Sequence, residues 1–401
     1  MLILHILRDL LLAAEVVIAL PVLYLCILSI SAMLGERRRK RRAMTASSPY
    51  AHFAILIPAH NEASVLGGLL DSLAMLDYPS DRYAVYVVAD NCTDTTAELA
   101  KGRAHVYERF DQEKRGKGFA LNWLWQELEK DQPAFDAYVI LDADSVVDPA
   151  FLRVMNEGLA SGSQALQGHN TVLNVMDSPG TALRWLALTL MNYVRPLGRN
   201  GLGCSSTLTG NGMCLSRTLL KRYPWQAFAL AEDYQYYLTL VQHGEKVVFM
   251  PAALVRSEMP STFAQMRTQD IRWEASQGAQ PKWRTAWELL KAGISNRDFV
   301  RIEAIAELLV PPLSSLISCC LLTFVGSLLL WWFPTVLVSL LLIVGVLFYI
   351  SSAFFLLCPP RAVYQGLMYA PVFVLWKLWV LLAARSKKHA SEWVRTSRNL
   401  L

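Results

Sequence analysis

Ala137-Tyr138-Val139-Ile140-Leu141-Asp142-Ala143-Asp144 is a short apolar run that ends in two carboxylates two positions apart. Such a run predicts a buried strand, and ligands of a parallel sheet bind beyond the carboxyl ends of its strands. Two carboxylates at a strand end can bind one Mg²⁺ or Mn²⁺ ion, with substrate phosphates completing its coordination. Asp142 and Asp144 are therefore candidate metal ligands, with a solvated acidic turn as the alternative. Asp148, which precedes Pro149, is expected to cap the next helix.

Strands and helices alternate along the chain before this stretch. The predicted strands are Phe53 to Ile57, Tyr83 to Ala89 and Ala104 to Tyr107. The predicted helices are Glu62 to Leu76, Thr95 to Lys101 and Gly118 to Lys130. This alternation predicts an α/β domain with a mostly parallel sheet and crossover helices. The polar clusters that follow the strands are then expected to meet at one edge of the sheet.

Two of these clusters are candidates to bind a nucleotide. Pro58-Ala59-His60-Asn61-Glu62 follows the first strand, and Asp90 closes the second. A carboxylate at a strand end can accept hydrogen bonds from a ribose hydroxyl or a base imide. The alternatives are structural: Asn61 as a helix N-cap with Glu62 in the first turn, and an Asx-turn in which Asp94 caps the next helix.

A basic turn and an acidic pair follow further along the chain. Arg115-Gly116-Lys117-Gly118 opens a helix, where backbone N–H groups and the Lys117 charge favour a bound anion. A solvated basic turn is the alternative. Glu232-Asp233 precedes a helix of apolar periodicity and is either a capping pair or the source of a general base.

The last polar cluster is Gln269-Asp270-Ile271-Arg272-Trp273. Gln269 and Trp273 lie four residues apart and would share one helix face. Arg272 can bind a phosphate, and Trp273 can stack on a sugar or a base. An ordinary helical turn is the alternative.

The composition and the N-terminal segment indicate a membrane protein. Hydrophobic residues make up 54% of the 401 residues and charged residues 18%, whereas soluble domains carry about 25% charged residues. Leu10 to Leu34 is long enough to cross a bilayer, and too long for the apolar region of a signal peptide. The basic cluster Arg37 to Arg42 places the chain after it in the cytoplasm by the positive-inside rule.

The C-terminal third contains two further predicted spans and one ambiguous segment. Leu308 to Phe333 and Val336 to Leu357 are long enough to span. Leu367 to Ala384 carries Lys377 near its middle, where a bilayer would disfavour a charge, and aromatic residues that favour the interface. An interfacial or re-entrant helix with a cytoplasmic basic tail is the favoured interpretation, and a fourth span is the alternative.

These observations divide the chain into eight regions. They are an N-terminal transmembrane helix (1–35), a basic cytosolic linker (36–48), a catalytic domain (49–280), amphipathic interface helices (281–307), two transmembrane helices (308–333 and 335–358), an interfacial, re-entrant or fourth transmembrane helix (363–385), and a basic tail (386–401).

Other classes of protein fit less well. The net charge is +5, but no basic stripe interleaved with aromatic residues appears in the polar region, which argues against nucleic-acid binding. The seven cysteines include no C-x-x-C pair, and we interpret them as reduced thiols. A dinucleotide-dependent oxidoreductase would need a Gly-x-Gly-x-x-Gly turn after the first strand, where this chain has Pro58-Ala59-His60-Asn61.

Taken together and in order, the six clusters resemble the membrane-bound family 2 glycosyltransferases, which include cellulose, chitin, hyaluronan and poly-N-acetylglucosamine synthases and ceramide glucosyltransferase-like enzymes. The resemblance runs from about Phe53 to Trp273 and includes the flanking membrane helices. It implies a GT-A fold, a nucleotide-sugar donor of the UDP type, a divalent cation, and inverting single-displacement transfer at the cytoplasmic face of the inner or plasma membrane.

The resemblance also implies roles for individual residues. Asp233 looks like the catalytic base. The residues similar to the family's nucleotide-binding elements are Pro58, Asn61, Glu62, Asp90, Lys117 and Asp142. Asp142 and Asp144 look like the metal-binding pair, with Asp144 the stronger ligand. Gln269, Arg272 and Trp273 look like the motif that binds the donor diphosphate and borders the acceptor, and Thr209-Gly210-Asn211-Gly212 resembles the loop that faces the acceptor.

The acceptor remains open between a polysaccharide and a lipid. Many polymer synthases have a glycine three residues after the motif tryptophan, where this chain has Ser276, with Gly278 later. The expected three or four spans are also fewer than in cellulose synthase. Both departures weaken the case for processive polymerisation. The expected acceptor is a polysaccharide or a lipid-linked molecule, with transfer of a single sugar to a lipid, in place of processive exopolysaccharide synthesis, as the alternative and an inert nucleotide-sugar receptor as a remote one. The sequence does not identify a partner subunit.

Overall fold

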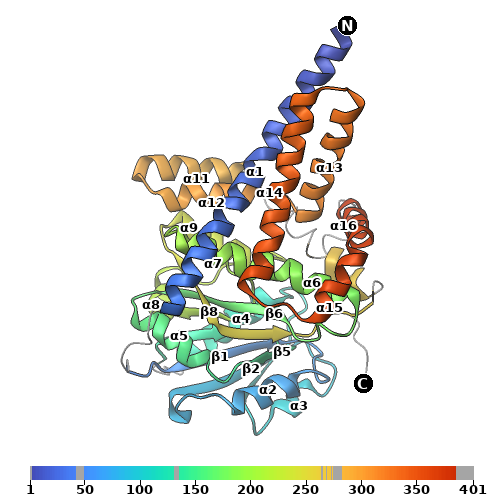
Figure 1. The fold of residues 1–401 in the computed structure, drawn as a ribbon. Coiled ribbons are helices and arrows are strands. Elements are labelled where there is room, and N and C mark those ends of the chain that lie inside the picture. Colours follow the sequence, from blue (N-terminus) through green and yellow to red (C-terminus); the bar gives the residue numbers. More distant parts are fainter. Residues whose placement is uncertain are drawn as a thin grey trace.

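The computed structural model describes residues 2–41, 49–130, 135–262, 265–267, 269–271, 273 and 282–384. Arg272, Ser276, Gly278 and the predicted basic tail lie outside the described residues, as does most of the basic linker. The described chain forms a sheet domain covered by helices and a group of long helices that projects from it (Figure 1). The N-terminus lies at the far end of this projection.

One eight-stranded sheet organises the domain, in the order β3-β2-β1-β4-β7-β6-β8-β5. The strands are β1 (Phe53–Ala59), β2 (Tyr83–Asp90), β3 (His105–Arg109), β4 (Ala137–Ile140), β5 (Ser145–Val147), β6 (Ala165–Val172), β7 (Met213–Ser216) and β8 (Val247–Ser257). The first four strands are mutually parallel, as the sequence predicted. The second half is mixed, because β7 lies antiparallel to both β4 and β6 and β5 lies antiparallel to β8.

Helices connect the strands and cover both faces of the sheet. Those of the domain are α2 (Leu66–Ala74), α3 (Thr96–Ala100), α4 (Lys117–Lys130), α5 (Phe151–Ala160), α6 (Pro179–Thr189), α7 (Arg195–Gly201), α8 (Arg217–Arg222) and α9 (Glu232–Gln242). A π-helical turn, Leu190–Val194, joins α6 to α7.

Helix α2 begins four residues later than predicted, and Asn61 is not its N-cap. Asn61 adopts a left-handed φ of 56°, and its side-chain oxygen accepts hydrogen bonds from Thr93 N (2.7 Å) and Asp94 N (3.3 Å). The residue therefore ties the loop after β1 to the loop after β2. Asp94 caps the following helix, because its carboxylate accepts from Thr96 N at 3.0 Å.

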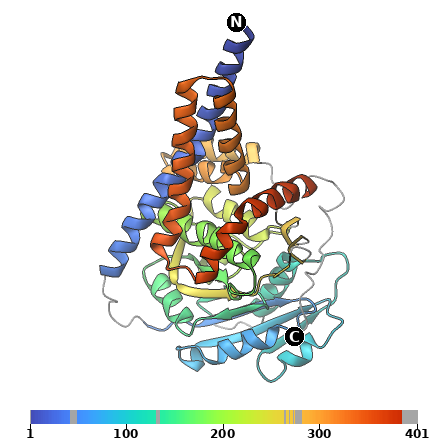
Figure 2. The same cartoon turned by 45° about the vertical axis from the view of Figure 1, so that its right-hand side comes forward.

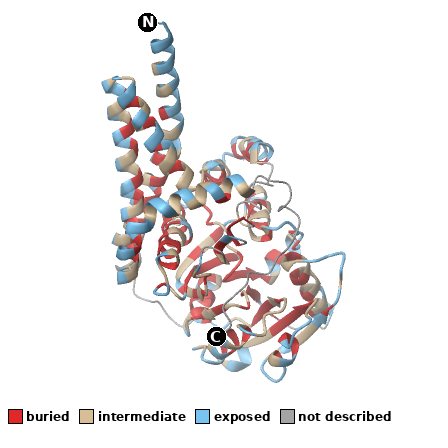
Figure 3. Ribbon diagram, turned by 90° about the vertical axis from the view of Figure 1, so that its right-hand side faces the viewer, coloured by how far each residue is buried: buried red, intermediate tan, exposed pale blue. Residues whose placement is uncertain are grey.

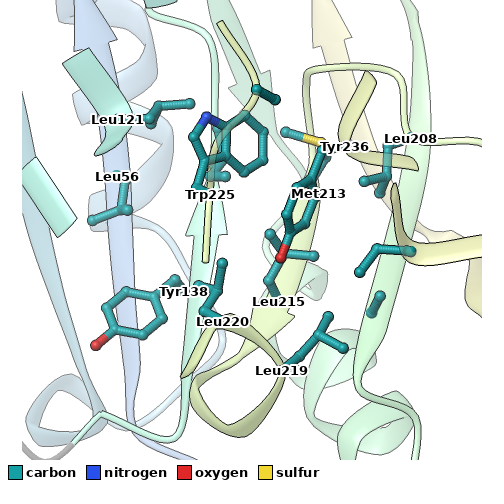
Figure 4. Packing of buried hydrophobic residues seen from close by; sticks show 14 of the residues in the cluster. Leu56, Leu121, Tyr138, Leu208, Met213, Leu215, Leu219, Leu220, Trp225 and Tyr236 are labelled. Carbon is teal, nitrogen blue, oxygen red and sulfur yellow. The ribbon is translucent and has the colours of Figure 1, made fainter. Parts of the chain in front are cut away.

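Two hydrophobic clusters lie on opposite faces of the sheet because side chains alternate along each strand. Phe53, Ile55 and Ile57 of β1 pack against α2 and α5. Ala54 and Leu56 face the other cluster, which contains α4, α8 and α9 side chains. Figure 4 shows the second cluster, where Trp225 and Tyr236 lie among leucines and Met213. Figure 3 shows the buried residues concentrated around this sheet.

The projecting bundle consists of α1 (Leu2–Arg41), α13 (Leu313–Leu329) and α14 (Phe333–Leu356) (Figures 1 and 2). Helix α1 is longer at both ends than the predicted apolar run. Glycines permit close approach of its backbone to the domain: a Cβ on Gly198 of α7 would lie 2.3 Å from Leu28 O. The bundle surface is largely apolar and exposed, at Leu20, Leu322 and Leu341 for example.

Three helices of the described chain are long and apolar enough to cross a membrane: Leu2–Arg37, Phe333–Leu356 and Arg361–Ala383. The last consists of α15 (Arg361–Gly366), a 3₁₀ turn (Leu367–Tyr369) and α16 (Ala370–Ala384). A fourth crossing exists if α12 (Phe299–Leu309) and α13 count as one, although they are bent by 70°. Pro311 and Pro312 lie between the two helices. Proline disfavours a continuous helix, which accounts for the bend.

Buried ion pairs join the junction helices to the domain. Helix α12 follows α11 (Lys282–Asn296), and the two lie beside the base of the bundle (Figure 1). Glu303 of α12 accepts two hydrogen bonds from the fully buried Arg199 of α7, at 2.7 and 2.8 Å, and a third from Tyr24 of α1 at 2.6 Å. Glu307 pairs with Arg195 one turn later. These contacts connect α1, α7 and α12.

Replacing Glu303 with glutamine is expected to destabilise the protein by about 3–5 kcal/mol, because the Arg199 charge would stay buried without its partner. Glu288→Gln is the matched control, since Glu288 pairs with Arg284 on the exposed side of α11 and such pairs contribute about 0.3–0.5 kcal/mol. Thermal unfolding of both variants in detergent micelles tests the difference. Equal thermal unfolding midpoints for Glu303→Gln and Glu288→Gln would contradict the predicted contribution of the Glu303–Arg199 pair to stability.

Candidate active site

Three of the predicted polar clusters converge at the carboxyl edge of the parallel strands. Asp142 follows β4, Lys117 is the first residue of α4, and Asp233 lies in the first turn of α9. The loop before β7 contributes Gly210. Elements far apart in the sequence thus bring one cation and three carboxyl groups together. The group is called the Lys117 cluster below and consists of Lys117, Asp142, Gly210, Glu232 and Asp233.

Lys117 lies at the centre of this cluster. Its Nζ donates to Asp142 Oδ1 at 2.6 Å and to the carbonyl oxygen of Gly210, and lies 3.6 Å from Glu232 Oε1. Burial lowers the pKa of Lys117, but the charges of Asp142 and Glu232 outweigh it, so the pKa lies above its usual range. The lysine therefore carries a full positive charge at neutral pH.

At the start of α9, Glu232 is buried and Asp233 is half-buried, and both carboxyls hold protons more tightly than exposed carboxyls. Burial raises the pKa of Glu232 to about 7, with Lys117 opposing the rise and Asp233 adding to it. Burial also raises the pKa of Asp233, again opposed by Lys117. Because the two carboxyls interact, they titrate as a pair. One carboxylate of this pair is suited to accept a proton near neutral pH.

Glycines at two positions permit the close approach of the elements. Gly210 has a φ of 77°, and a Cβ there would lie 2.9 Å from Asp233 Oδ2. A Cβ on Gly118 would lie 2.1 Å from the Ala227 carbonyl oxygen, so α4 can approach the loop before α9 only with glycine there. Both glycines belong to motifs that the sequence analysis selected for other reasons.

Asn211 organises the strand end that carries the aspartate pair. Its side-chain nitrogen donates to Ser145 Oγ (2.8 Å) and Ser257 Oγ (2.9 Å), and its oxygen accepts from Asp142 N (3.1 Å). The side chain is fully buried. Asn211 thereby fixes the backbone at Asp142 relative to β5 and β8, a positioning role that its place in a glycine-rich loop did not reveal.

The carboxyl groups of Asp142 and Asp144 have donor atoms that fit a hard divalent cation. Both residues are half-buried at the end of β4, and Asp142 also holds Lys117. Among the described residues, no group of three or more histidine, cysteine, aspartate or glutamate side chains is arranged to hold a metal. Two carboxylate residues suffice for Mg²⁺ or Mn²⁺ when substrate phosphates supply further oxygens.

The loops after β1 and β2 lie against each other, with Asp90 at their base. Asp90 is buried and pairs with Arg109 of β3 at 2.6 Å. Burial raises the pKa of Asp90, and the hydrogen bond from Arg109 opposes the rise. His60 Nδ1 lies 2.7 Å from the Asp90 carbonyl oxygen, and Glu62 N donates to Thr96 Oγ1 at 2.8 Å. The sequence analysis missed Arg109, since nothing in the strand pattern around it indicated a buried partner.

A second group of residues surrounds the Gln269-to-Trp273 segment. Arg184 of α6 is almost fully buried and donates to Gln269 Oε1 at 2.7 Å and to Asp270 Oδ1 at 2.5 Å. Its guanidinium carbon also lies 5.3 Å from the centre of the Trp273 ring. Gln269 and Trp273 therefore share a partner, as their spacing predicted. Arg184 itself was missed, because it lies 85 residues earlier in the chain.

The fold is similar to that of a solved glycosyltransferase. The mannosyltransferase PcManGT from Pyrobaculum calidifontis, determined in complex with GDP-Man and Mn²⁺, superimposes with a TM-score of 0.52 at 16% sequence identity. The similarity covers 92% of this chain and 99% of that protein. It extends over both the sheet domain and most of the helices that flank it.

Sequence relatives are also glycosyltransferases. The chain is 26% identical over 230 residues to a probable glycosyltransferase, YdaM, of Bacillus subtilis, covering 55% of this chain and 54% of that one. It is 28% identical over 274 residues to a beta-monoglucosyldiacylglycerol synthase of Nostoc, covering 65% of this chain and 56% of that one. The chain spans about half the length of the relatives it matches.

The family model described as "Glycosyltransferase like family 2" matches residues 49–276, which is more than half of the chain and includes every residue of the Lys117 cluster. The chain belongs to this family and is a glycosyltransferase with a GT-A-like fold.

Proposed function

We propose that this enzyme transfers one sugar from a nucleotide-sugar donor, of the UDP type, to a lipid acceptor at the membrane surface, with inversion at the anomeric carbon. The main supporting observation is the Lys117 cluster, where two neighbouring carboxyl groups of raised pKa lie beside a cation at the carboxyl edge of the sheet. This arrangement combines a proton acceptor with a site for negative charge.

Asp233 is the proposed general base. Its Oδ1 accepts from Tyr234 N at 2.7 Å, which fixes the carboxylate, and its Oδ2 borders Gly210 in the loop that would face the acceptor. The carboxylate removes the proton of the acceptor hydroxyl as that oxygen bonds to the anomeric carbon. The bond from the anomeric carbon to the phosphate oxygen breaks, and its electrons leave with the nucleoside diphosphate.

Lys117 and the aspartate pair are proposed to hold the diphosphate. The lysine charge is available to phosphate oxygens because its partner Asp142 is 38% exposed and can exchange partners when a ligand binds. Asp142 and Asp144 would hold a Mg²⁺ or Mn²⁺ ion, which neutralises charge on the leaving diphosphate when bound. Gln269, Arg272 and Trp273 complete the proposed donor and acceptor contacts.

The loops after β1 and β2 are the proposed nucleotide-binding surface. Pro58, Asn61 and Glu62 lie on the first loop and Asp90 at the base of the second, and Asn61 joins the two loops. Because Arg109 occupies one oxygen of Asp90, we assign to Asp90 the role of holding the surface together as well as that of binding ribose or base.

A lipid acceptor agrees with the surface of the molecule and with its relatives. The bundle exposes apolar side chains along helices that are long enough to span a bilayer. The beta-monoglucosyldiacylglycerol synthases among the relatives are named for a glycolipid product. We place the catalytic domain at the cytoplasmic face of the inner or plasma membrane, because the run of basic residues that begins at Arg37 lies at the end of α1 that adjoins the domain.

The test of the proposed function is a product assay with purified protein in lipid nanodiscs, radiolabelled UDP- and GDP-sugars, Mn²⁺ and a bacterial lipid extract. A single lipid-soluble product on thin-layer chromatography is expected. Asp233→Asn should reduce its formation by at least about a thousandfold, since the proton acceptor is lost, while calorimetric UDP binding stays within about twofold. A ladder of long chains would show that the acceptor is a polysaccharide and not a lipid. Turnover by Asp233→Asn at the wild-type rate would refute the assignment of Asp233 as the base.

The pH dependence of transfer should report the carboxyl pair. Because Asp233 must be unprotonated and burial raises its pKa, kcat/KM is expected to fall with decreasing pH in a range above the usual pKa of an aspartate. Glu232→Gln removes a neighbouring negative charge, so the pKa of Asp233 should decrease and the acid limb should move to lower pH. Glu245→Gln, in an exposed pair with Arg222, is the control and should leave the profile unchanged. An acid limb that stays in place in Glu232→Gln would contradict the coupling.

Asp144→Ala is expected to weaken Mn²⁺-dependent UDP binding by about tenfold or more, because an oxygen ligand of the cation is lost. Calorimetric titration of UDP with and without a chelator measures the effect. Asp81→Ala, at an exposed turn, serves as the control. Equal UDP affinity for the wild-type enzyme and the Asp144 variant, with and without the chelator, would argue against this metal site.

A further inference from the structure

The segment that carries Gln269 and Trp273 lies between two helices of different character. On one side is α6, where Arg184 binds Gln269 and Asp270, and where a Cβ on Gly180 would lie 2.6 Å from the buried Met266. On the other side is α16. The described part of the segment therefore depends for its position on contacts that both helices provide.

Asp270 is the point at which the two helices meet. It is fully buried, and its two oxygens have different partners. Oδ1 accepts from Arg184 of α6. Oδ2 lies 3.1 Å from Lys377 Nζ and accepts from Trp376 Nε1 at 3.4 Å, both from α16. A buried carboxylate is stable only while such partners remain, because an unpaired charge in the protein interior costs several kcal/mol.

A third contact joins α16 to the same segment. The guanidinium carbon of Arg267 lies 5.2 Å from the centre of the Trp379 ring. Trp376 and Trp379 stack on each other at 5.1 Å, and Val380 is fully buried. Trp376, Lys377 and Val380 thus attach one side of α16 to the catalytic domain, and Trp379, which is 42% exposed, lies at the border between this side and the exposed one.

The outer side of α16 is apolar and exposed. Val372, Leu375, Trp379 and Leu382 are 56%, 67%, 42% and 65% exposed, respectively. Their spacing of three, four and three residues puts them on one face of the helix. Helix α16 is also in contact with α13, whose exposed residues include the apolar Leu321 and Leu322. Hydrocarbon is the partner that such a surface fits, because water disfavours a contiguous apolar stripe beside a membrane-embedded bundle.

The inner contacts also fix the orientation of α16. Lys377 and Trp376 can reach Asp270 only while the helix lies against the catalytic domain, and Figure 2 shows it crossing at a steep angle to α1 and α14. A helix that crossed the bilayer alongside the bundle would have to bring Lys377 into hydrocarbon without Asp270.

We propose that α16 is a membrane-surface helix whose Lys377 positions Asp270, and through it the Gln269-to-Trp273 segment, for donor binding. Insertion of the apolar stripe into the bilayer surface holds Lys377 and Trp376 against Oδ2 of Asp270. Arg184 binds the other carboxylate oxygen, Oδ1. Lys377 is a positioning residue, since it acts through Asp270. The inference rests on the proposed role of Gln269 and Trp273 in donor binding.

The experiment compares Lys377→Met and Lys377→Arg in nanodiscs. Lys377→Met is expected to raise the donor KM, and the Kd for UDP with Mn²⁺ measured by calorimetry, by about tenfold, with kcat within about twofold. Lys377→Arg keeps the charge and should restore both constants to within about twofold. Lys291→Met is the matched control, because Lys291 lies over Trp287 of its own helix at 5.3 Å, as Lys377 lies over Phe373 at 5.8 Å. The control should match the wild type.

A second arm tests the lipid-facing side. The double variant Leu375→Gln/Leu382→Gln should raise the Kd for UDP in nanodiscs by a similar factor, because α16 would lose its place at the surface. An unchanged Kd in this variant or in Lys377→Met, or a failure of Lys377→Arg to restore binding, would overturn the proposal. Calorimetry of UDP requires no turnover, so a wild-type enzyme that binds UDP but makes no glycolipid would refute the proposed function and leave this test intact.

Discussion

One half-buried positive charge among three carboxyl groups is the interaction on which the carboxyl edge of the sheet depends. Lys117 comes from the start of α4, Asp142 from the end of β4, and Glu232 and Asp233 from the start of α9. Without the lysine, these carboxyls would repel one another in a site of low polarity, and without them the lysine would be buried unpaired. The ends of three elements are therefore held together by charge, and the same charges set the pKa values on which proton transfer depends.

The backbone near this charge has to allow short approaches that side chains would prevent. Gly210 and Gly118 occupy positions where a Cβ would collide with Asp233 and with the Ala227 carbonyl oxygen. Asn211 then holds the aspartate strand end through Ser145 and Ser257. Packing thus determines where the elements meet, and polar contacts determine the orientation of each functional group.

Local patterns predicted the first half of the sheet because its strands are short, apolar and parallel, with polar clusters immediately after them. The predicted boundary of α2 was wrong, since Asn61 has a left-handed φ and binds the next loop, a choice that only the tertiary partner Thr93 explains. The antiparallel strands were not foreseen, because β7 follows a long excursion through α6 and α7 and its place between β4 and β6 is a non-local choice. Arg109 and Arg184 escaped prediction for the same reason: each is defined by a carboxylate or amide distant in the sequence.

Ion pairs between a buried carboxylate and a guanidinium or ammonium group recur where the sheet domain meets the long apolar helices. Arg199 joins Glu303 of α12, and Arg184 with Lys377 joins Asp270 to α6 and α16. Apolar contacts alone would let such helices slide, because dispersion is non-directional, whereas a buried ion pair loses several kcal/mol when its partners separate. The pairs therefore fix the register and tilt of the domain against helices whose other faces are suited to lipid. In the proposed arrangement, the helices that are apolar enough to span a bilayer are continuous with the candidate active site, and a change at the bilayer surface would reach the segment proposed to hold the donor through Lys377 and Asp270.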